Sequence, residues 1–195
     1  MTSWPLPGQL TSYVDAQTGA TPLAIMKSAI KSGDASLLDK LPSSFDLLLG
    51  RAADGFGVGS LGEVCALALL LGFAFLFWKK IITWHIPVSI LLTVFIFSGL
   101  LHAANPAYAN PLQVVLSGGL LLGAIFMATD YVTSPMTHRG QLLYGVMIGL
   151  LTVIIRDWGS YPEGMSFAIL IMNGFTPLIN IYIRPKRFGE VPVKH

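Results

Sequence analysis

The chain has 195 residues, of which 53% are hydrophobic and only 11% are charged. A soluble domain is typically about 25% charged, so this composition argues against an ordinary water-soluble globule and favours a protein embedded in lipid. The net charge of +2 and the lack of a basic stripe argue against a nucleic-acid partner. The single cysteine, Cys65, excludes an internal disulfide and a cysteine-based metal cluster.

The composition changes sharply near residue 60. Residues 1–60 are mixed and polar, residues 61–183 hold long apolar runs, and residues 184–195 form a basic tail. We therefore expect an all-α integral membrane protein. Its parts would be a mostly irregular extracytoplasmic segment with one short helix, about five transmembrane helices, and a cytoplasmic tail.

The short helix is expected directly after Thr21, which suits a helix N-cap, with Pro22 at the first helical position. Leu23, Met26 and Ile30 would then share one face of this helix. The hydroxyl of Thr21 would lie at the positive end of the helix dipole. Free backbone N–H groups at that end could stabilise a phosphate ester.

Five apolar runs follow, from residue 61 to 78, from 81 or 82 to 101, and over 112–129, 142–155 and 165–183. Crossing a bilayer core of about 30 Å takes about 20 helical residues. The fourth run is short, so we expect its helix to begin earlier, within residues 137–141. Two glycine pairs with helical spacing, Gly119/Gly123 and Gly145/Gly149, are expected to be packing surfaces.

The basic residues predict the orientation. With five spans, Lys79, Lys80, Arg139 and the basic tail fall on one side of the membrane, which we assign to the cytoplasm. The segment around Thr21 then lies in the periplasm. Because no signal peptide is visible to carry a polar segment across, we expect further membrane spans upstream of these residues in the natural protein.

The residues from Asp15 to Thr21 read Asp-Ala-Gln-Thr-Gly-Ala-Thr. This stretch resembles the acceptor motif of bacterial flavin transferase, which moves FMN from FAD onto the last threonine through a phosphoester bond. The resemblance implies that Thr21 carries FMN covalently and that Asp15 is the acid of the motif. The small core between them would consist of Thr18, Gly19 and Ala20.

A second resemblance rests on residues 59–63, 126–135 and 156–164, together with Asn173 and Pro177. These segments are similar to the D subunit of the Rnf complex and to its relative, the B subunit of the Na⁺-pumping NADH:quinone oxidoreductase. The likeness runs through the whole chain, although family members have about ten spans in two halves and only the second half is present here. The ending soon after residues 184–186 favours the Rnf protein.

This resemblance implies a membrane electron-transfer subunit of the bacterial inner membrane. It would work with the other subunits of the Rnf complex, between ferredoxin and NAD⁺, and be coupled to Na⁺ or H⁺ movement. Flavin transferase would be its maturation partner. A second, noncovalent flavin such as riboflavin is a further expectation from the family.

Two other readings remain open. In one, the chain is a flavin-free channel or carrier half, with Glu63, Asp130 and Asn173 along a polar path. In the other, it is a structural protein that holds partners through its glycine pairs. Under any reading, Glu63 and Asp130 are the candidate ion or flavin contacts, because ionisable groups close to membrane depth are functional candidates. No catalytic nucleophile and no metal ligand is expected.

Overall fold

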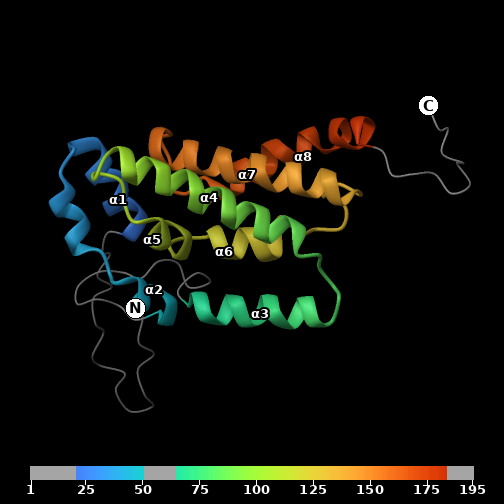
Figure 1. The fold of residues 1–195 in the computed structure, drawn as a ribbon, viewed down its shortest axis with the longest axis horizontal. Helices are drawn as coiled ribbons and strands as arrows, with labels where there is room; N and C mark the ends of the chain where they lie inside the picture. The colour runs from blue at the N-terminus through green and yellow to red at the C-terminus, as the bar shows by residue number, and fades with distance from the viewer. Residues whose placement is uncertain (1–20, 51–64, 184–195) are drawn as a thin grey trace, which may run out of the picture.

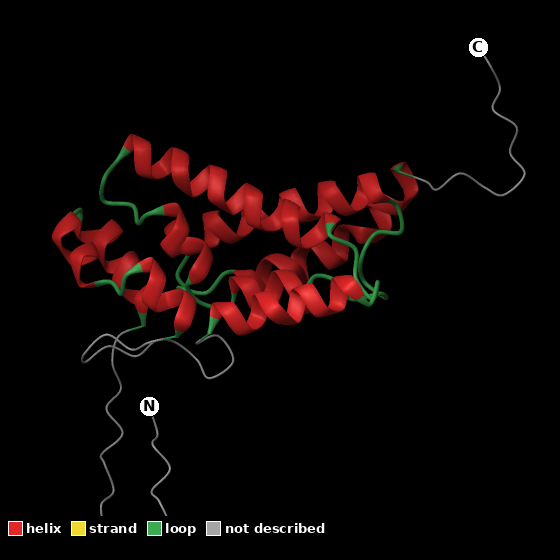
Figure 2. Cartoon of the chain, turned by 60° about the horizontal axis from the view of Figure 1, so that its bottom comes forward, coloured by secondary structure: helices red, strands yellow, loops and turns green. Residues whose placement is uncertain are grey.

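The computed structural model describes residues 21–50 and 65–183, and every regular element within them is helical (Figures 1 and 2). The amino-terminal part holds α1 (Pro22–Ser32), the 3-10 helix η1 (Ala35–Lys40) and α2 (Ser44–Leu49). The remainder holds α3 (Ala66–Trp78), α4 (His85–Ala104), α5 (Pro111–Leu116), α6 (Leu120–Leu122), the π-helical turn η2 (Gly123–Met127), α7 (His138–Trp158) and α8 (Met165–Tyr182).

The amino-terminal part is more regular than its sequence suggests, so the prediction of a mostly irregular segment is wrong for residues 21–50. Local capping explains the difference. The Ser43 hydroxyl accepts a hydrogen bond from the Asp46 backbone N–H at 3.2 Å and starts α2. Gly33 and Gly50 end α1 and α2 in the left-handed conformation, each with φ of 73°. Figure 1 shows α1 and α2 at one end of the bundle.

Three helices are long and apolar enough to cross a membrane: α4, α7 and α8, with 20, 21 and 18 residues. The chain is therefore a multi-pass membrane protein. The expectation that the fourth span begins early is confirmed, because α7 starts at His138 and the Thr137 hydroxyl accepts from the Gly140 N–H at 3.1 Å. In the described residues α3 has only 13 residues and runs as a shorter apolar helix.

Helices α4 and α7 form the centre of the bundle, and the Gly145/Gly149 pair lies at their contact. A Cβ atom on Gly145 would lie 3.1 Å from the Ile86 carbonyl oxygen, and one on Gly149 would lie 3.1 Å from that of Ile90. The backbones approach closely because neither glycine has a side chain. This pair is confirmed as a packing surface.

The third predicted span is broken, so the prediction of one continuous helix over residues 112–129 is wrong. Helix α5 ends at Leu116, and the chain resumes in α6 only at Leu120. Gly118 in the gap has φ of +67°, a left-handed conformation that ends a helix and that glycine adopts without strain. Gly119 is the N-cap of α6, and its carbonyl oxygen accepts from the Gly123 N–H one turn later at 2.7 Å; a Cβ atom at Gly123 would collide with Met165.

Candidate functional site

Thr21 occupies the position that the sequence predicts. It is the N-cap of α1, with φ of −71° and ψ of 153°, and its hydroxyl oxygen accepts from the Ala24 N–H at 3.3 Å. The residue is exposed, so its hydroxyl is reachable from outside the fold. The other residues of the flavin acceptor motif, Asp15, Thr18, Gly19 and Ala20, lie outside the described residues.

Helix α1 is held against the end of the bundle by its apolar face. Ile25 and Met26 are buried with Leu41 and Ala109, and Leu23 packs on the same cluster. The predicted face is confirmed, because Leu23, Met26 and Ile30 all line one cavity between α1 and the bundle. The position of Thr21 is therefore fixed, because the helix that it caps is packed against the bundle through its apolar face.

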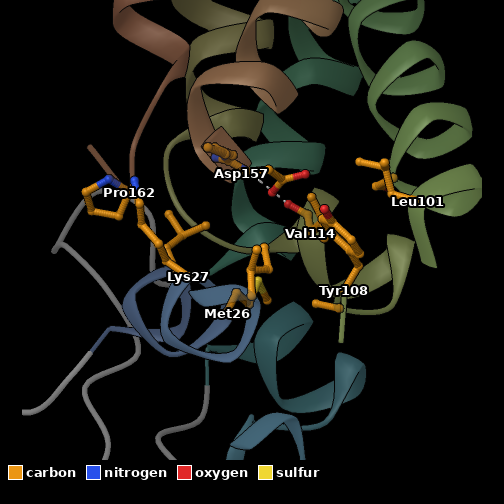
Figure 3. A pocket seen from close by; sticks show the side chains of 12 residues that line it. Met26, Lys27, Leu101, Tyr108, Val114, Asp157 and Pro162 are labelled. Atoms are coloured by element: carbon orange, nitrogen blue, oxygen red, sulfur yellow. Dashed lines mark hydrogen bonds between the residues drawn. The ribbon is translucent and has the colours of Figure 1, made fainter. Parts of the chain in front are cut away.

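That cavity has charged residues in its wall (Figure 3). Lys27 of α1 reaches it, is only 8% exposed, and donates from Nζ to the Tyr161 carbonyl oxygen at 2.7 Å. Burial lowers the pKa of the Lys27 ammonium, the nearby Lys31 charge lowers the pKa further, and Asp157 opposes the shift. The cavity has a volume of about 30 Å³. That is room for a water molecule or two, whereas pockets for ligands of drug size hold about 300 Å³ or more.

The break between α5 and α6 is bound by an ion pair from the far end of the sequence. Arg156 of α7 is 5% exposed and donates to the carbonyl oxygens of Val114 at 3.0 Å and Ser117 at 3.4 Å. It also pairs with the Glu163 carboxylate at 3.0 Å. The second carboxylate oxygen of Glu163 accepts from the Gly119 N–H at 3.0 Å. The ion pair therefore satisfies backbone groups on both sides of the break.

Helix α1 also rests on this break. A Cβ atom at Gly118 would collide with the Leu23 Cδ1 atom and would lie 2.5 Å from the Glu163 carboxylate. Leu23 is two positions after Thr21, so the start of α1, the break and the ion pair form one contact region. We call this region, made of Leu23, Gly118, Arg156 and Glu163, the anchor of α1.

Of the two predicted acidic contacts, the structure describes only Asp130, which is not brought to this region. Asp130 is exposed and accepts from the Thr133 hydroxyl at 3.3 Å. It lies in the connection from η2 to α7, and α7 begins at the opposite end of the bundle from α1 (Figure 1). Glu63 lies outside the described residues. Arg156 pairs with Glu163, a residue that the sequence did not single out.

Sequence reasoning missed two parts of this site. Lys27 falls one residue after Met26, so it borders the apolar face, and a lysine there was a signal for a buried ammonium. The run Ser117-Gly118-Gly119 was a signal for a break, because three small residues in succession pack little apolar surface and two of them are poor helix formers.

The helices and Thr21 define a class of protein: a helical, multi-pass membrane protein in which an exposed threonine caps a helix at one end of the bundle. Comparison with known proteins then identifies the family. A model of the NQR2, RnfD, RnfE family matches residues 1–189. The chain therefore belongs to this family.

Curated relatives agree with the match. The D subunit of the Na(+)-translocating ferredoxin:NAD(+) oxidoreductase complex of Acetobacterium woodii is 42% identical over 198 residues, which cover 100% of this chain and 57% of the relative. The proton-translocating counterpart of Clostridium ljungdahlii is 40% identical, over 97% of this chain and 58% of the relative. The D subunit of the ion-translocating oxidoreductase complex of Pseudomonas paraeruginosa is 39% identical, over 97% and 57%. The chain thus spans a little over half the length of these relatives.

Proposed function

We propose that this chain is the flavin-carrying part of the D subunit in an ion-translocating ferredoxin:NAD⁺ oxidoreductase of the Rnf type. FMN would be joined to Thr21 through a phosphoester bond. The observation that carries the proposal is the exposed Thr21 hydroxyl, placed as the N-cap of an anchored helix at the end of an acceptor motif.

The residues around Thr21 fit a phosphate. Pro22 has no N–H, but the N–H groups that follow in the first turn of α1 point toward the cap, and the helix dipole favours negative charge there. No acidic residue occurs in this first turn, so nothing in it repels a phosphate. Esterification of the hydroxyl oxygen would keep the cap position and add oxygens that can accept from those N–H groups.

The flavin ring would lie outside the cavity behind α1, because about 30 Å³ is far too small for it. When bound, FMN supplies chemistry in one- or two-electron steps, which lets it join iron–sulfur carriers to a nicotinamide. The protein residues fix the position of the attachment point. Leu23 and Met26 pack α1 against the bundle, and Lys27 of α1 donates a hydrogen bond to the Tyr161 carbonyl oxygen. A covalent tether prevents loss of a cofactor from an exposed position.

The relatives support the choice within the family. The three described above are named as D subunits of ferredoxin-dependent or ion-translocating complexes. One is named for Na⁺ and another for protons at 42% and 40% identity. Since all three are named as D subunits, the B subunit of the quinone-reducing relative is the second choice.

The test is covalent flavin on the denatured chain. The chain is produced together with flavin transferase, and fluorescence is read at its own band after denaturing electrophoresis. We expect a fluorescent wild-type band and a dark Thr21→Val band. Ser28→Ala is the matched control, since it removes an exposed hydroxyl from the same helix and leaves the acceptor motif intact, so its band should stay fluorescent. A dark wild-type band, with a proven acceptor fluorescent in the same cells, would sink the proposal.

One observation favours a second candidate, a channel or carrier half. Broken membrane segments such as α5–α6 line substrate sites in many transporters. Here, however, Arg156 and Glu163 already occupy the backbone groups of the break. A colourless native protein that moves an ion in vesicles without any redox partner would establish this alternative.

A further inference from the structure

Three cations at the end of the bundle opposite α1 have no counter-charge in the described part of the chain. Lys79, Lys80 and Arg139 are all exposed. The one ion pair among the described residues belongs to the anchor of α1, at the other end. Asp130 contacts the Thr133 hydroxyl and lies within 4 Å of none of the three cationic groups. The three charges are therefore available to an anion from outside these residues.

The connection from α3 to α4 is held against the start of α7. The His85 and His138 rings stack with their centroids 4.4 Å apart. The Thr83 hydroxyl donates to Gln141 Oε1 at 3.1 Å. The two lysines of this connection therefore lie in the same contact region as Arg139, which follows His138 directly (Figure 1). We call the two lysines and Arg139 the basic patch.

Lys80 occupies a backbone position that usually belongs to glycine. Its φ is 55°, and among the described residues it is the only non-glycine residue with a positive φ. Helix α3 ends in a Schellman motif, in which the Lys80 N–H donates to the Phe77 carbonyl oxygen at 2.9 Å. The Ile81 N–H donates to the Leu76 carbonyl oxygen at 3.0 Å. Glycine adopts this conformation without strain and lysine does not, so the backbone gains nothing from the lysine and its charge is the feature that distinguishes it.

The patch lies where an apolar helix surface meets the depth of the lipid headgroups. Trp78 and Trp84 are exposed beside it, as is typical of aromatic side chains at a membrane interface. Lys79 Nζ lies 5.9 Å from the ring centroids of both Phe75 and Trp78, so the lysine stem follows the apolar surface of α3. Leu71 and Phe75 continue this exposed apolar surface along the helix. Positive charge at the end of an apolar face suits a molecule with an anionic head and hydrocarbon chains.

We propose that the basic patch binds an anionic phospholipid, with the phosphate at the three cations and the acyl chains along α3. Charge complementarity carries the choice of occupant. Lipid phosphates are the anions at this depth of a membrane, and basic residues beside membrane helices attract anionic lipids. The proposal depends on these contacts and is independent of a flavin at Thr21.

The test compares two lipids with the same acyl chains and different headgroup charge. The complete protein that contains these residues is purified with its native partners in a nonionic detergent. Its melting temperature is then titrated with dioleoyl phosphatidylglycerol, which is anionic, or with dioleoyl phosphatidylcholine, which is zwitterionic. We expect phosphatidylglycerol to raise the melting temperature at a lower concentration, because a ligand that binds the folded state stabilises it.

Two variants separate binding from folding. Arg139→Gln should weaken the apparent affinity for phosphatidylglycerol by about fivefold, the contribution of one cation near an anionic lipid surface. Lys80→Gly should weaken it by a similar factor and yet raise the melting temperature without lipid, because glycine removes the strain of the left-handed backbone. A purely structural role of Lys80 would give the second effect without the first. Lys31→Gln is the matched control, since Lys31 is an exposed lysine of α1, and it should leave the affinity unchanged.

Four results would overturn the proposal. Equal affinity for the two lipids would mean that the patch does not select an anionic headgroup. An equal shift from inorganic phosphate at the same concentration would assign the patch to a soluble anion. An equal loss of affinity with Lys31→Gln would mean that net charge attracts the lipid and that the patch does not. No response to phosphatidylglycerol in the assembled protein would mean that a protein partner covers the patch. In-gel flavin fluorescence reports Thr21 separately, so either proposal can fail alone.

Discussion

At the scale of single residues, Arg156 links the most distant parts of the chain. Its guanidinium is bound to carbonyl groups of α5 and of the break, and to the Glu163 carboxylate. A buried charge of this kind is costly unless it is paired and hydrogen-bonded, so the anchor of α1 depends on these partners, although the buried Arg156 Nε finds none among the described residues. Arginine suits the position because its planar fork can donate in several directions at once.

Removing the charge of Arg156 should strongly lower the free energy of unfolding. Arg156→Met leaves one Glu163 carboxylate oxygen and two carbonyl oxygens without a donor. Breaking a fully buried pair typically costs about 3–5 kcal/mol, but the Glu163 side chain is 33% exposed, so about 2–3 kcal/mol is expected here. We expect a loss of that size in the free energy of unfolding, measured in micelles by denaturant titration. Arg139→Met is the matched control, since Arg139 is exposed on the same helix and should change stability by less than about 0.5 kcal/mol. Equal effects of the two substitutions would contradict the anchor.

Gly118 tests the contact between α1 and the break. Gly118→Ala places a Cβ atom against Leu23 and Glu163, in a backbone with φ of +67°. Gly33→Ala imposes a similar backbone strain at φ of +73°, with no atom within 4 Å of the added Cβ. The control should lose about 1 kcal/mol from the strain alone. We expect Gly118→Ala to lose about 1–3 kcal/mol more, from overpacking. Equal losses would show that Leu23 and Glu163 do not press on Gly118.

At the scale of elements, the sequence predicts those helices whose cause is local. Thr21 and Thr137 cap α1 and α7 as side-chain chemistry suggests, and the apolar runs of α4 and α8 predict both helices within a few residues. The break between α5 and α6 could not be predicted from hydropathy, since hydropathy does not register backbone conformation. It depends on Arg156 and Glu163, which follow it by about 40 residues.

The contact of α4 with α7 gives the prediction at this scale. Gly145→Ala would drive a Cβ atom into the Ser89 hydroxyl and to 3.1 Å from the Ile86 carbonyl oxygen. We expect a net loss of about 1–3 kcal/mol in the free energy of unfolding, although alanine is the better helix former. The double variant with Ser89→Ala should recover part of the loss, because the hydroxyl is the nearest obstacle. Strict additivity of the two changes would mean that the helices separate as a whole.

At the scale of the whole molecule, the two ends of the bundle have different character. The end with α1 holds Thr21 and the Arg156–Glu163 pair. The opposite end holds the exposed Lys79, Lys80 and Arg139. Basic residues next to membrane helices are retained on the cytoplasmic side. Although α1 itself carries Lys27 and Lys31, the basic residues that flank α3 and α7 at the opposite end, together with those of residues 184–195, predict a periplasmic Thr21. Under the function proposed above, a flavin at Thr21 would then lie on the face opposite to cytoplasmic ferredoxin and NAD⁺.

That orientation can be tested with single cysteines in a Cys65→Ser background. Ser32→Cys reports the end with α1, where Ser32 is exposed, and Val132→Cys reports the other end, where Val132 is 87% exposed. In intact cells that make the whole complex, with the outer membrane permeabilised, a membrane-impermeant maleimide should label Ser32→Cys. It should label Val132→Cys only after the inner membrane is broken. The reverse pattern would place Thr21 in the cytoplasm, beside the soluble electron carriers. Labelling of both positions in intact cells would mean that the orientation is mixed and that these basic residues do not determine it.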